Sequence, residues 1–157
     1  MSRRAVAPVV GVVLVLAVVV TLAGIVGVFV VGVDGQMDDP PTATITAERE
    51  TGDRYDNPKI VLTHVAGDEL NARDLTIRIL VDGQPLEDQP VVPAPAGMDG
   101  FVGTLSAPLQ KGGDNTWSAG ETTSLVVAGT NSPYPSTGSS LTINFYVDGT
   151  AIATARA

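Results

Sequence analysis

An uninterrupted apolar run, residues 5–33, dominates the amino-terminal part of this chain and contains no charged side chain. Uncharged apolar runs of eighteen or more residues are typical of membrane-spanning helices, because a bilayer core of about 30 Å needs roughly 20 residues of helix. Seventeen Val, Leu, Ile or Phe residues lie within residues 9–31. At roughly −0.3 to −0.6 kcal/mol each, they contribute about −5 to −10 kcal/mol to insertion. The sequence therefore predicts a hydrophobic helix over residues 6–33.

The length and composition of this run limit how its helix can lie in a membrane and pack with other helices. Valine-rich sequence forms helices poorly in water, but in lipid every backbone group must be satisfied within the segment. At 1.5 Å per residue the run is about 43 Å long, so it either tilts or extends beyond the bilayer. Ala17, Thr21 and Gly24, spaced four and three residues apart, form a stripe of small residues that lets another helix approach closely. Lone membrane helices also carry such stripes.

The charges on either side of the run predict its orientation. Arg3 and Arg4 precede it, whereas Asp34, Asp38 and Asp39 follow it. By the positive-inside rule we expect a single-pass cell-membrane protein with a cytoplasmic amino terminus and an extracellular carboxy-terminal domain. A cleavable secretory signal has an apolar core of about 7 to 15 residues, which this run exceeds. An uncleaved signal anchor is the simplest alternative.

Residues 4–14 read Arg-Ala-Val-Ala-Pro-Val-Val-Gly-Val-Val-Leu. This segment resembles the amino-terminal segment of archaeal type IV pilins, particularly the haloarchaeal kind, whose usual form reads Ala-Val-Ser-Pro-Val-Ile-Gly-Val-Ile-Leu. The differences are Ala7 in place of serine, and Val10 and Val13 in place of isoleucine. The resemblance covers residues 4–33.

The resemblance implies a class III leader, residues 1–5, that a prepilin peptidase removes on the cytoplasmic side while the helix stays on the mature subunit. By analogy with the basic-then-small pair before the cut, the expected bond is Ala5–Val6, with Arg4–Ala5 as the second choice. The implied partners are prepilin peptidase, the membrane and other pilin subunits, in a homo-oligomeric surface filament used for attachment. Unlike the bacterial pattern, no glutamate follows the expected new terminus.

The remaining chain predicts a β domain. Residues 34–41 form a polar linker in which Pro40-Pro41 cannot continue the helix. Over residues 42–157 apolar and polar residues alternate with period two, and Asp82-Gly83 and Asp148-Gly149 suit type I′ turns. The predicted strands are residues 43–48, 60–65, 75–81, 101–105, 122–128, 141–147 and 150–156. Roughly seven or eight short strands without a helical period favour a β-sandwich over a barrel.

Two proline-containing loops, residues 85–100 and 129–140, are predicted to be exposed. Tyr134, held between Pro133 and Pro135, is the candidate contact residue of the second loop. Two further segments, residues 63–70 and 117–121, are similar to stretches of haloarchaeal pilin-like domains.

The charge of the domain excludes several partners. All seventeen acidic residues but only seven basic residues follow the helix, a net charge of −10 that repels nucleic acid and phosphate-rich ligands. Lysine is limited to Lys59 and Lys111, and Asp outnumbers Glu. This balance suggests a surface adapted to high salt, with an ordinary acidic domain as the alternative. The absence of cysteine excludes disulfides and thiolate chemistry.

The sequence contains no convincing catalytic or cofactor pattern. His64, the only histidine, lies in an apolar strand and is predicted to be structural, and Trp117 is a predicted core residue. Two acidic groups offer oxygen atoms of the kind calcium binds: Asp34, Asp38 and Asp39, and Asp114 with Glu121. Neither has the spacing of a calcium loop, and the glycines form no phosphate-binding pattern. We therefore expect no enzyme, metal or cofactor.

Two functions remain open. The first is a type IV pilin-like structural subunit, cut by prepilin peptidase and assembled through its helix. The second is a monomeric membrane-anchored binding module, an adhesin or receptor with an uncleaved anchor, that uses the loops at residues 85–99 and 129–140 as contact surfaces.

Overall fold

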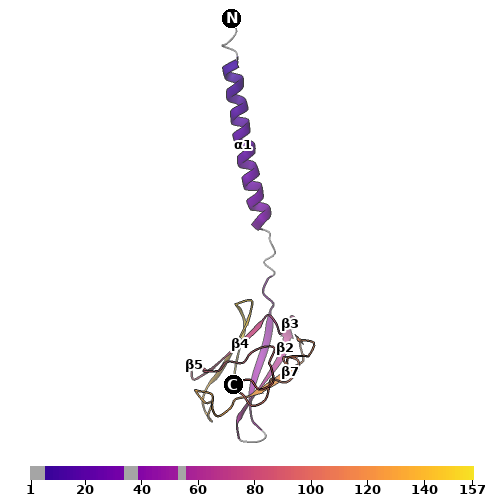
Figure 1. Cartoon of the computed structure of the whole chain (residues 1–157), viewed down its shortest axis with the longest axis vertical. Coiled ribbons are helices and arrows are strands. Elements are labelled where there is room, and N and C mark those ends of the chain that lie inside the picture. The colour runs from indigo at the N-terminus through magenta and orange to yellow at the C-terminus, as the bar shows by residue number, and fades with distance from the viewer. Residues whose placement is uncertain (1–5, 34–38, 53–55) are drawn as a thin grey trace. The chain divides into compact units, whose positions relative to one another are not determined.

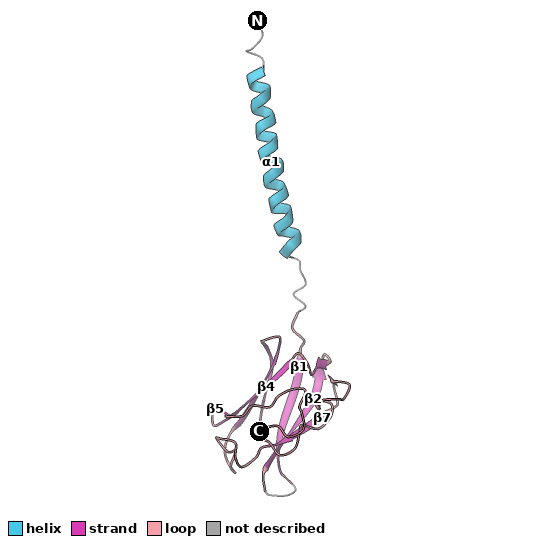
Figure 2. Ribbon diagram, in the orientation of Figure 1, coloured by secondary structure: helices cyan, strands magenta, loops and turns pink. Residues whose placement is uncertain are grey.

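The structure, a computed structural model, describes residues 6–33, 39–52 and 56–157, and within the helix the side chains of residues 8–25. The chain divides into two compact units, Met1–Asp39 and Pro40–Ala157. The first contains the helix α1 and the second contains every described strand (Figures 1 and 2). An amino-terminal helix followed by an all-β region confirms the predicted fold class.

Helix α1, Val6–Val33, is 28 residues long and has no acidic residue in its first turn and no basic residue in its last. Pro8 is its third residue. The first N–H groups of a helix have no intrahelical partner, so the N–H that Pro8 lacks removes no hydrogen bond. At 1.5 Å per residue α1 measures about 42 Å, longer than the hydrocarbon core of a bilayer.

The second unit contains nine strands in its described part, six of five residues or more and three of only two residues. Their bounds are β1 Ala43–Thr51, β2 Pro58–Gly67, β3 Leu70–Asn71, β4 Leu75–Val81, β5 Gln84–Pro85, β6 Thr116–Trp117, β7 Thr122–Val126, β8 Leu141–Val147 and β9 Thr150–Arg156. The six longer strands are the ones whose alternation is visible in the sequence.

All the strand pairs are antiparallel and make two main sheets. One sheet has the order β1-β2-β7 and the other has the order β5-β4-β8-β9, while β3 and β6 form a separate short pair. Figure 2 shows these strands as one group of magenta arrows.

Alternate residues of both main sheets meet in one hydrophobic core, as in a β-sandwich. Strands β2 and β4 have the burial pattern of strands with one face inside, and β8 repeats it. The largest fully buried side chains include Ile60 and Leu62 of β2, Ile77 of β4 and Phe145 of β8. Trp117 of β6 is also fully buried, so the short pair contributes to the same core.

The two predicted Asp-Gly turns are confirmed. Asp82 and Gly83 have φ values of 51° and 81°, and Asp148 and Gly149 have 49° and 81°. Positive φ at both central residues is the property of a type I′ turn, whose twist matches that of the flanking strands. These turns join β4 to β5 and β8 to β9.

The predicted strand at residues 101–105 is wrong. Only Phe101 makes a bridge, to Val127, and Gly103 has a φ of 83°, which interrupts an extended backbone. The segment instead covers the outer edge of β7, because Val102 N–H donates to the Val126 carbonyl at 2.9 Å. A covered edge is protected from pairing with another chain.

The loop at residues 85–100 is less exposed than predicted, since Leu86, Ala94 and Met98 are buried in the core. The Gln89 amide replaces a strand here: its Oε1 accepts from Ile79 N–H at 2.7 Å and its Nε2 donates to the Ile79 carbonyl at 3.0 Å. Proline-rich backbone has few N–H groups to offer, so a side-chain amide completes the edge of β4.

Candidate functional site

The surface of α1 is apolar and unburied along its described length. Every side chain from Pro8 to Ile25 is exposed, and this stretch is long and apolar enough to cross a membrane. A helix that is hydrophobic on all sides must be covered on all sides, by lipid or by other helices. No described residue of its own unit covers α1 between Pro8 and Ile25.

Ala17, Thr21 and Gly24 occupy one face of α1, because residues four and three apart lie above one another on a helix. The Thr21 hydroxyl donates within the helix and lies 2.9 Å from the carbonyl oxygens of Ala17 and Val18. It therefore needs no partner from lipid or from a second helix. Around Gly24 a Cβ atom would meet nothing within 4 Å, so this face is open to close approach.

The predicted cleavage residues lie at the amino-terminal border of α1. Val6 is its first residue, whereas Arg4 and Ala5 lie outside the described residues. Both candidate bonds thus precede the helix, and a cut at either would leave α1 whole.

The chain is fastened to the β domain where β1 begins. Asp68 accepts hydrogen bonds through Oδ2 from the backbone N–H of Thr42 at 2.9 Å and from its hydroxyl at 3.0 Å. In return, Asp68 N–H donates to the Thr42 carbonyl at 2.7 Å. We call these three hydrogen bonds the Thr42–Asp68 clasp.

Gly67 permits the clasp. Its φ is 118°, and a Cβ atom at this position would lie only 2.2 Å from the Thr42 carbonyl oxygen. The backbone N–H of Thr42 and then its hydroxyl hold the pKa of the Asp68 carboxyl below the ordinary aspartate value, because hydrogen bonds to a carboxylate favour its charged form.

His64 is fully buried and structural in its contacts. Its Nδ1 lies 3.1 Å from the Trp117 carbonyl oxygen, and since a carbonyl only accepts, Nδ1 carries the proton. Its ring meets the Trp117 ring edge-on at 5.5 Å between centroids. His64 Nε2 is buried without a partner in the described part of the chain.

The two segments singled out in the β domain, residues 63–70 and 117–121, lie together. Gly120 N–H donates to the His64 carbonyl at 2.6 Å, and His64 N–H donates to the Glu121 carbonyl at 3.0 Å. Trp117 Nε1 donates to the same Glu121 carbonyl at 3.1 Å. These segments therefore form one structural unit around the buried His64 and Trp117 rings.

Of the acidic residues considered as calcium ligands, the structure describes Asp39, Asp114 and Glu121. Asp34 and Asp38 fall outside the described residues, and Asp39 is exposed. The Glu121 carboxylate accepts from Ser118 N–H at 2.7 Å. In the described ranges no group of three or more His, Cys, Asp or Glu residues is placed to hold a metal ion.

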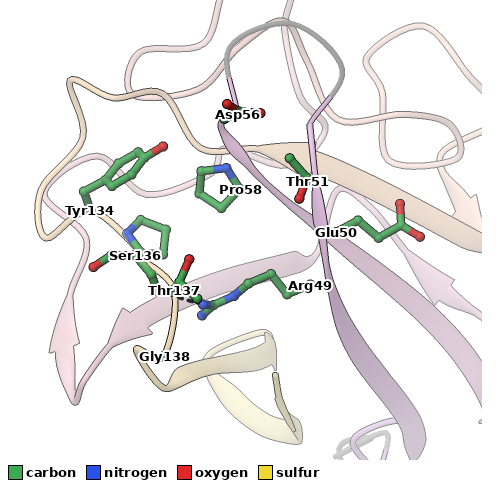
Figure 3. Close-up of a pocket in the computed structure, with 10 residues that line it drawn as sticks. Arg49, Glu50, Thr51, Asp56, Pro58, Tyr134, Ser136, Thr137 and Gly138 are labelled. Carbon is green, nitrogen blue, oxygen red and sulfur yellow. Dashed lines mark hydrogen bonds between the residues drawn. The ribbon is translucent and has the colours of Figure 1, made fainter.

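Tyr134 borders a cleft of about 500 Å³ at the carboxy-terminal end of β1 (Figure 3). Among the described residues, the cleft is lined by Arg49, Glu50, Thr51, Asp56, Pro58 and residues 134–138. Tyr134 is 38% exposed, and its hydroxyl lies 3.3 Å from the Asn57 Oδ1 atom. The predicted contact residue is thus part of a concave surface.

Arg49 fixes the loop that forms one wall of this cleft. Its Nη1 donates to the Ser136 carbonyl at 2.9 Å, and its Nη2 donates to the Ser139 carbonyl at 2.7 Å. Arg49 Nε is buried without a hydrogen-bond partner among the described atoms. The guanidinium therefore holds the protein's own loop in place.

Asn131 joins the two proline-containing loops. Its buried amide donates through Nδ2 to the Asp88 and Gly100 carbonyls, and its Oδ1 accepts from Asp88 N–H at 3.1 Å. Neither Asn131 nor Arg49 has a local sequence pattern that predicts its role. What the sequence does show is that Arg49 stands on the inward-facing side of the alternation in β1, where an apolar residue is expected.

The chain belongs to the class of small proteins that carry an antiparallel β domain on a single apolar amino-terminal helix. Residues 4–45 match the family model described as archaeal type IV pilin, N-terminal. The amino-terminal segment is therefore similar to that of archaeal type IV pilins, and this match supports a pilin-like subunit. The family is structural and implies membrane association and assembly with other pilin subunits. No curated protein matches the chain.

Proposed function

We propose that this protein is processed by prepilin peptidase and assembles through α1 into a surface filament used for attachment. The observation that supports this most directly is the helix itself, whose side chains are exposed from Pro8 to Ile25 within the segment that matches the pilin family. A surface of this kind suits lipid before assembly and neighbouring helices after it.

The transfer from membrane to filament is energetically reasonable. Lipid tails and helix side chains are similarly apolar, so exchanging one for the other costs little hydrophobic free energy. The net gain must come from close packing, which the stripe Ala17, Thr21 and Gly24 favours. The Thr21 hydroxyl is satisfied inside its own helix, so it adds no desolvation cost on either side of the exchange.

The orientation follows from the charges. Arg3 and Arg4 would hold the amino terminus in the cytoplasm, where the peptidase cuts, and the acidic β domain would face outward. Cleavage at Ala5–Val6 would leave the mature chain beginning at the first residue of α1. Cleavage at Arg4–Ala5 would leave one alanine ahead of it.

Intact-mass measurement of the membrane-extracted chain tests processing. In a strain with active prepilin peptidase we expect the mass of residues 6–157, and in a peptidase deletion strain the mass of residues 1–157. The variant Ala5→Phe, which places a bulky residue before the cut, should stay full-length, while the control Val6→Ile should still be cut. A full-length wild-type chain in the active strain would contradict the proposal.

Electron microscopy separates this function from the alternative, a monomeric anchored binding module with an uncleaved leader. The alternative is favoured only by the cleft beside Tyr134. Filaments that a specific antibody labels, and that are absent in the Ala5→Phe strain, are expected for a pilin-like subunit. A cut chain that stays dispersed in the membrane would refute the assembly part of the proposal.

A further inference from the structure

The two outer faces of the β-sandwich differ in the charges that their strands carry. Strands β4, β8 and β9 contain no acidic residue, and Arg78 of β4 and Arg156 of β9 lie on their outer side, which we call the arginine face. On the other sheet, the outer side of β1 carries Glu48 and Glu50, the only carboxylates within the described strands. From this asymmetry we propose that the arginine face docks on the outer side of β1 in a second copy of this chain.

The strand register places both arginines on one face. Arg78 lies opposite Asn144 and Arg156 lies opposite Thr142, and both partners alternate with the buried residues of β8. Side chains directly opposite each other in antiparallel strands share a face of the sheet, so both arginine side chains lie on the side away from the core. Between them, Thr154 Oγ1 donates to Asn144 Oδ1 at 2.9 Å.

The two arginines are available to a partner. Both are exposed, and neither guanidinium forms a hydrogen bond or an ion pair within the described residues. Arg49, in contrast, donates from both Nη atoms to its own loop, and Lys59 pairs with Glu50 at 2.9 Å. Guanidinium groups bind carboxylates through paired hydrogen bonds, so a surface that carries carboxylates fits the arginine face.

Glu48 is the available carboxylate on the opposite side of the sandwich. It is exposed and, unlike Glu50, forms no ion pair in the part of the chain that the structure describes. Its neighbours on the outer side of β1, Thr44 and Thr46, are exposed and uncharged, and Val61 of β2 lies opposite it. A sheet face can therefore approach Glu48 without burying several unpaired charges, which would be costly.

The charges require a contact between unlike faces. The arginine face turned on itself would place arginine against arginine, which disfavours a symmetric dimer. Within one chain, Arg78 and Glu48 cannot meet, because the two sheets share one core and stacked sheets lie about 10 Å apart. A contact between unlike faces leaves one free face of each kind and repeats into an open filament.

This inference rests on the proposed function for the proximity of the copies. Two domains that each carry a net charge of −10 repel each other at a distance. Subunits held together through α1 meet at a high effective concentration, so a contact that is weak by itself can form. The sandwich contact then adds to the packing of the helices and sets how neighbouring domains are oriented.

A zero-length cross-link tests the contact. Arg78→Lys keeps the positive charge and supplies an amine, which a carbodiimide joins to a carboxylate that touches it. Full-length protein is treated in the membrane fraction and in the filament fraction, and the linked peptides are identified by mass spectrometry. We expect a link between position 78 and Glu48, which must join two copies, and we expect its loss when Glu48→Gln is added. The Lys59–Glu50 pair is the internal control for the reaction.

Charge reversal provides a second readout. Arg78→Glu combined with Arg156→Glu should lower the filament yield about tenfold, because like charges then face each other, with unchanged processing and membrane amounts. Adding Glu48→Arg to Arg78→Glu exchanges the two charges and should restore most of the yield lost in Arg78→Glu alone. The control Lys111→Glu makes the same change in charge at an exposed position outside the strands and should keep normal yield.

The inference would be overturned if position 78 gave no link in either fraction while Lys59 and Glu50 were linked. A link only to a different protein would refute a second copy as the partner, and a link only to another carboxylate of this chain would refute the outer side of β1. Normal yield in the double reversal would also contradict the contact. A chain that is cut and forms filaments without the link would remove this inference and leave the proposed function intact.

Discussion

Asp68 is an exposed residue that stabilises the fold through its negatively charged carboxylate. Its carboxylate accepts two hydrogen bonds from Thr42, and these contacts keep its pKa below the ordinary aspartate value in the folded state. A depressed folded pKa stabilises the fold above the unfolded pKa of about 3.9 and loses that contribution as pH falls through the folded value. The clasp should therefore weaken in acid.

We predict that wild type is more stable than Asp68→Asn by a constant amount above about pH 5, and that the difference shrinks below about pH 4. The measurement is the unfolding midpoint against pH, followed by the fluorescence of Trp117, the single tryptophan. Thr42→Val keeps the backbone N–H, the larger cause of the shift, and should retain most of this pH dependence. The matched control Asp99→Asn removes one negative charge at another exposed position. A difference in unfolding midpoint between wild type and Asp68→Asn that stays constant down to pH 2 would contradict the prediction.

Gly67 and Gly103 both have positive φ but differ in their surroundings. A Cβ atom at Gly67 would lie 2.2 Å from the Thr42 carbonyl oxygen, whereas at Gly103 it would meet nothing within 4 Å. We predict that Gly103→Ala costs about 1 kcal/mol from backbone strain alone. Gly67→Ala should cost about 2–4 kcal/mol because steric overlap is added to the strain. Urea unfolding of both variants measures the difference, and equal costs would show that the clasp moves aside without penalty.

Helix α1 presents two faces that can be altered independently. Ala17 and Gly24 lie on the small-residue stripe, while Val19, at 100° per residue, lies on nearly the opposite face. All three side chains are exposed within the helix unit. If the stripe is the packing face, enlarging it should impair assembly but not insertion into the membrane.

We therefore predict that Ala17→Leu or Gly24→Leu lowers the filament yield at least tenfold, which corresponds to about 1.4 kcal/mol per subunit contact, with unchanged amounts of membrane-bound subunit. The matched control Val19→Leu should keep normal yield. Yield is measured by quantifying sheared filaments against the membrane fraction. Loss of filaments in Val19→Leu alone would assign packing to the opposite face.

The sequence predicted the longer elements well because their signals are local. The apolar run identified α1, and period-two alternation with Asp-Gly turns identified β4, β8 and β9. The segment at residues 101–105 was wrongly predicted, since its alternation is broken by the positive φ of Gly103. The side-chain amides of Gln89 and Asn131 could not be predicted, because each pairs with backbone that the fold brings near.

The same distinction applies to the candidate site. The helix and its stripe can be read directly from spacing, but the cleft joins Arg49 to a loop more than eighty residues later in the chain. Tyr134 could be recognised as exposed from its flanking prolines. The wall opposite it, and the role of Arg49 in holding the loop, depend on tertiary packing alone.

At the scale of the whole molecule, the excess of acidic over basic residues implies a response to salt. The described residues contain one ion pair within 4.0 Å, between Lys59 and Glu50 at 2.9 Å, so most of the excess negative charge is not neutralised by close pairing. Mutual repulsion between the carboxylates opposes folding, and salt screens it over a Debye length of about 10 Å at 0.1 M and about 3 Å at 1 M.

We predict that the unfolding midpoint rises as KCl increases from about 0.1 M to about 2 M. Sucrose at equal osmolality provides the uncharged comparison, because it also favours compact states but does not screen charge. A variant with Glu48→Gln, Glu87→Gln and Asp99→Asn, all at exposed positions, should show a smaller salt response. Equal responses to KCl and sucrose would indicate that charge repulsion is not the cause.

The position of the cleft along β1 has a mechanical consequence. The chain joins the domain at the amino-terminal end of β1, through the Thr42–Asp68 clasp, while Arg49, Glu50 and Thr51 of the cleft lie at its carboxy-terminal end. A pull applied between these two points would run along β1 itself. Its covalent backbone would carry the load, and the hydrogen bonds that pair β1 with β2 would not have to resist it.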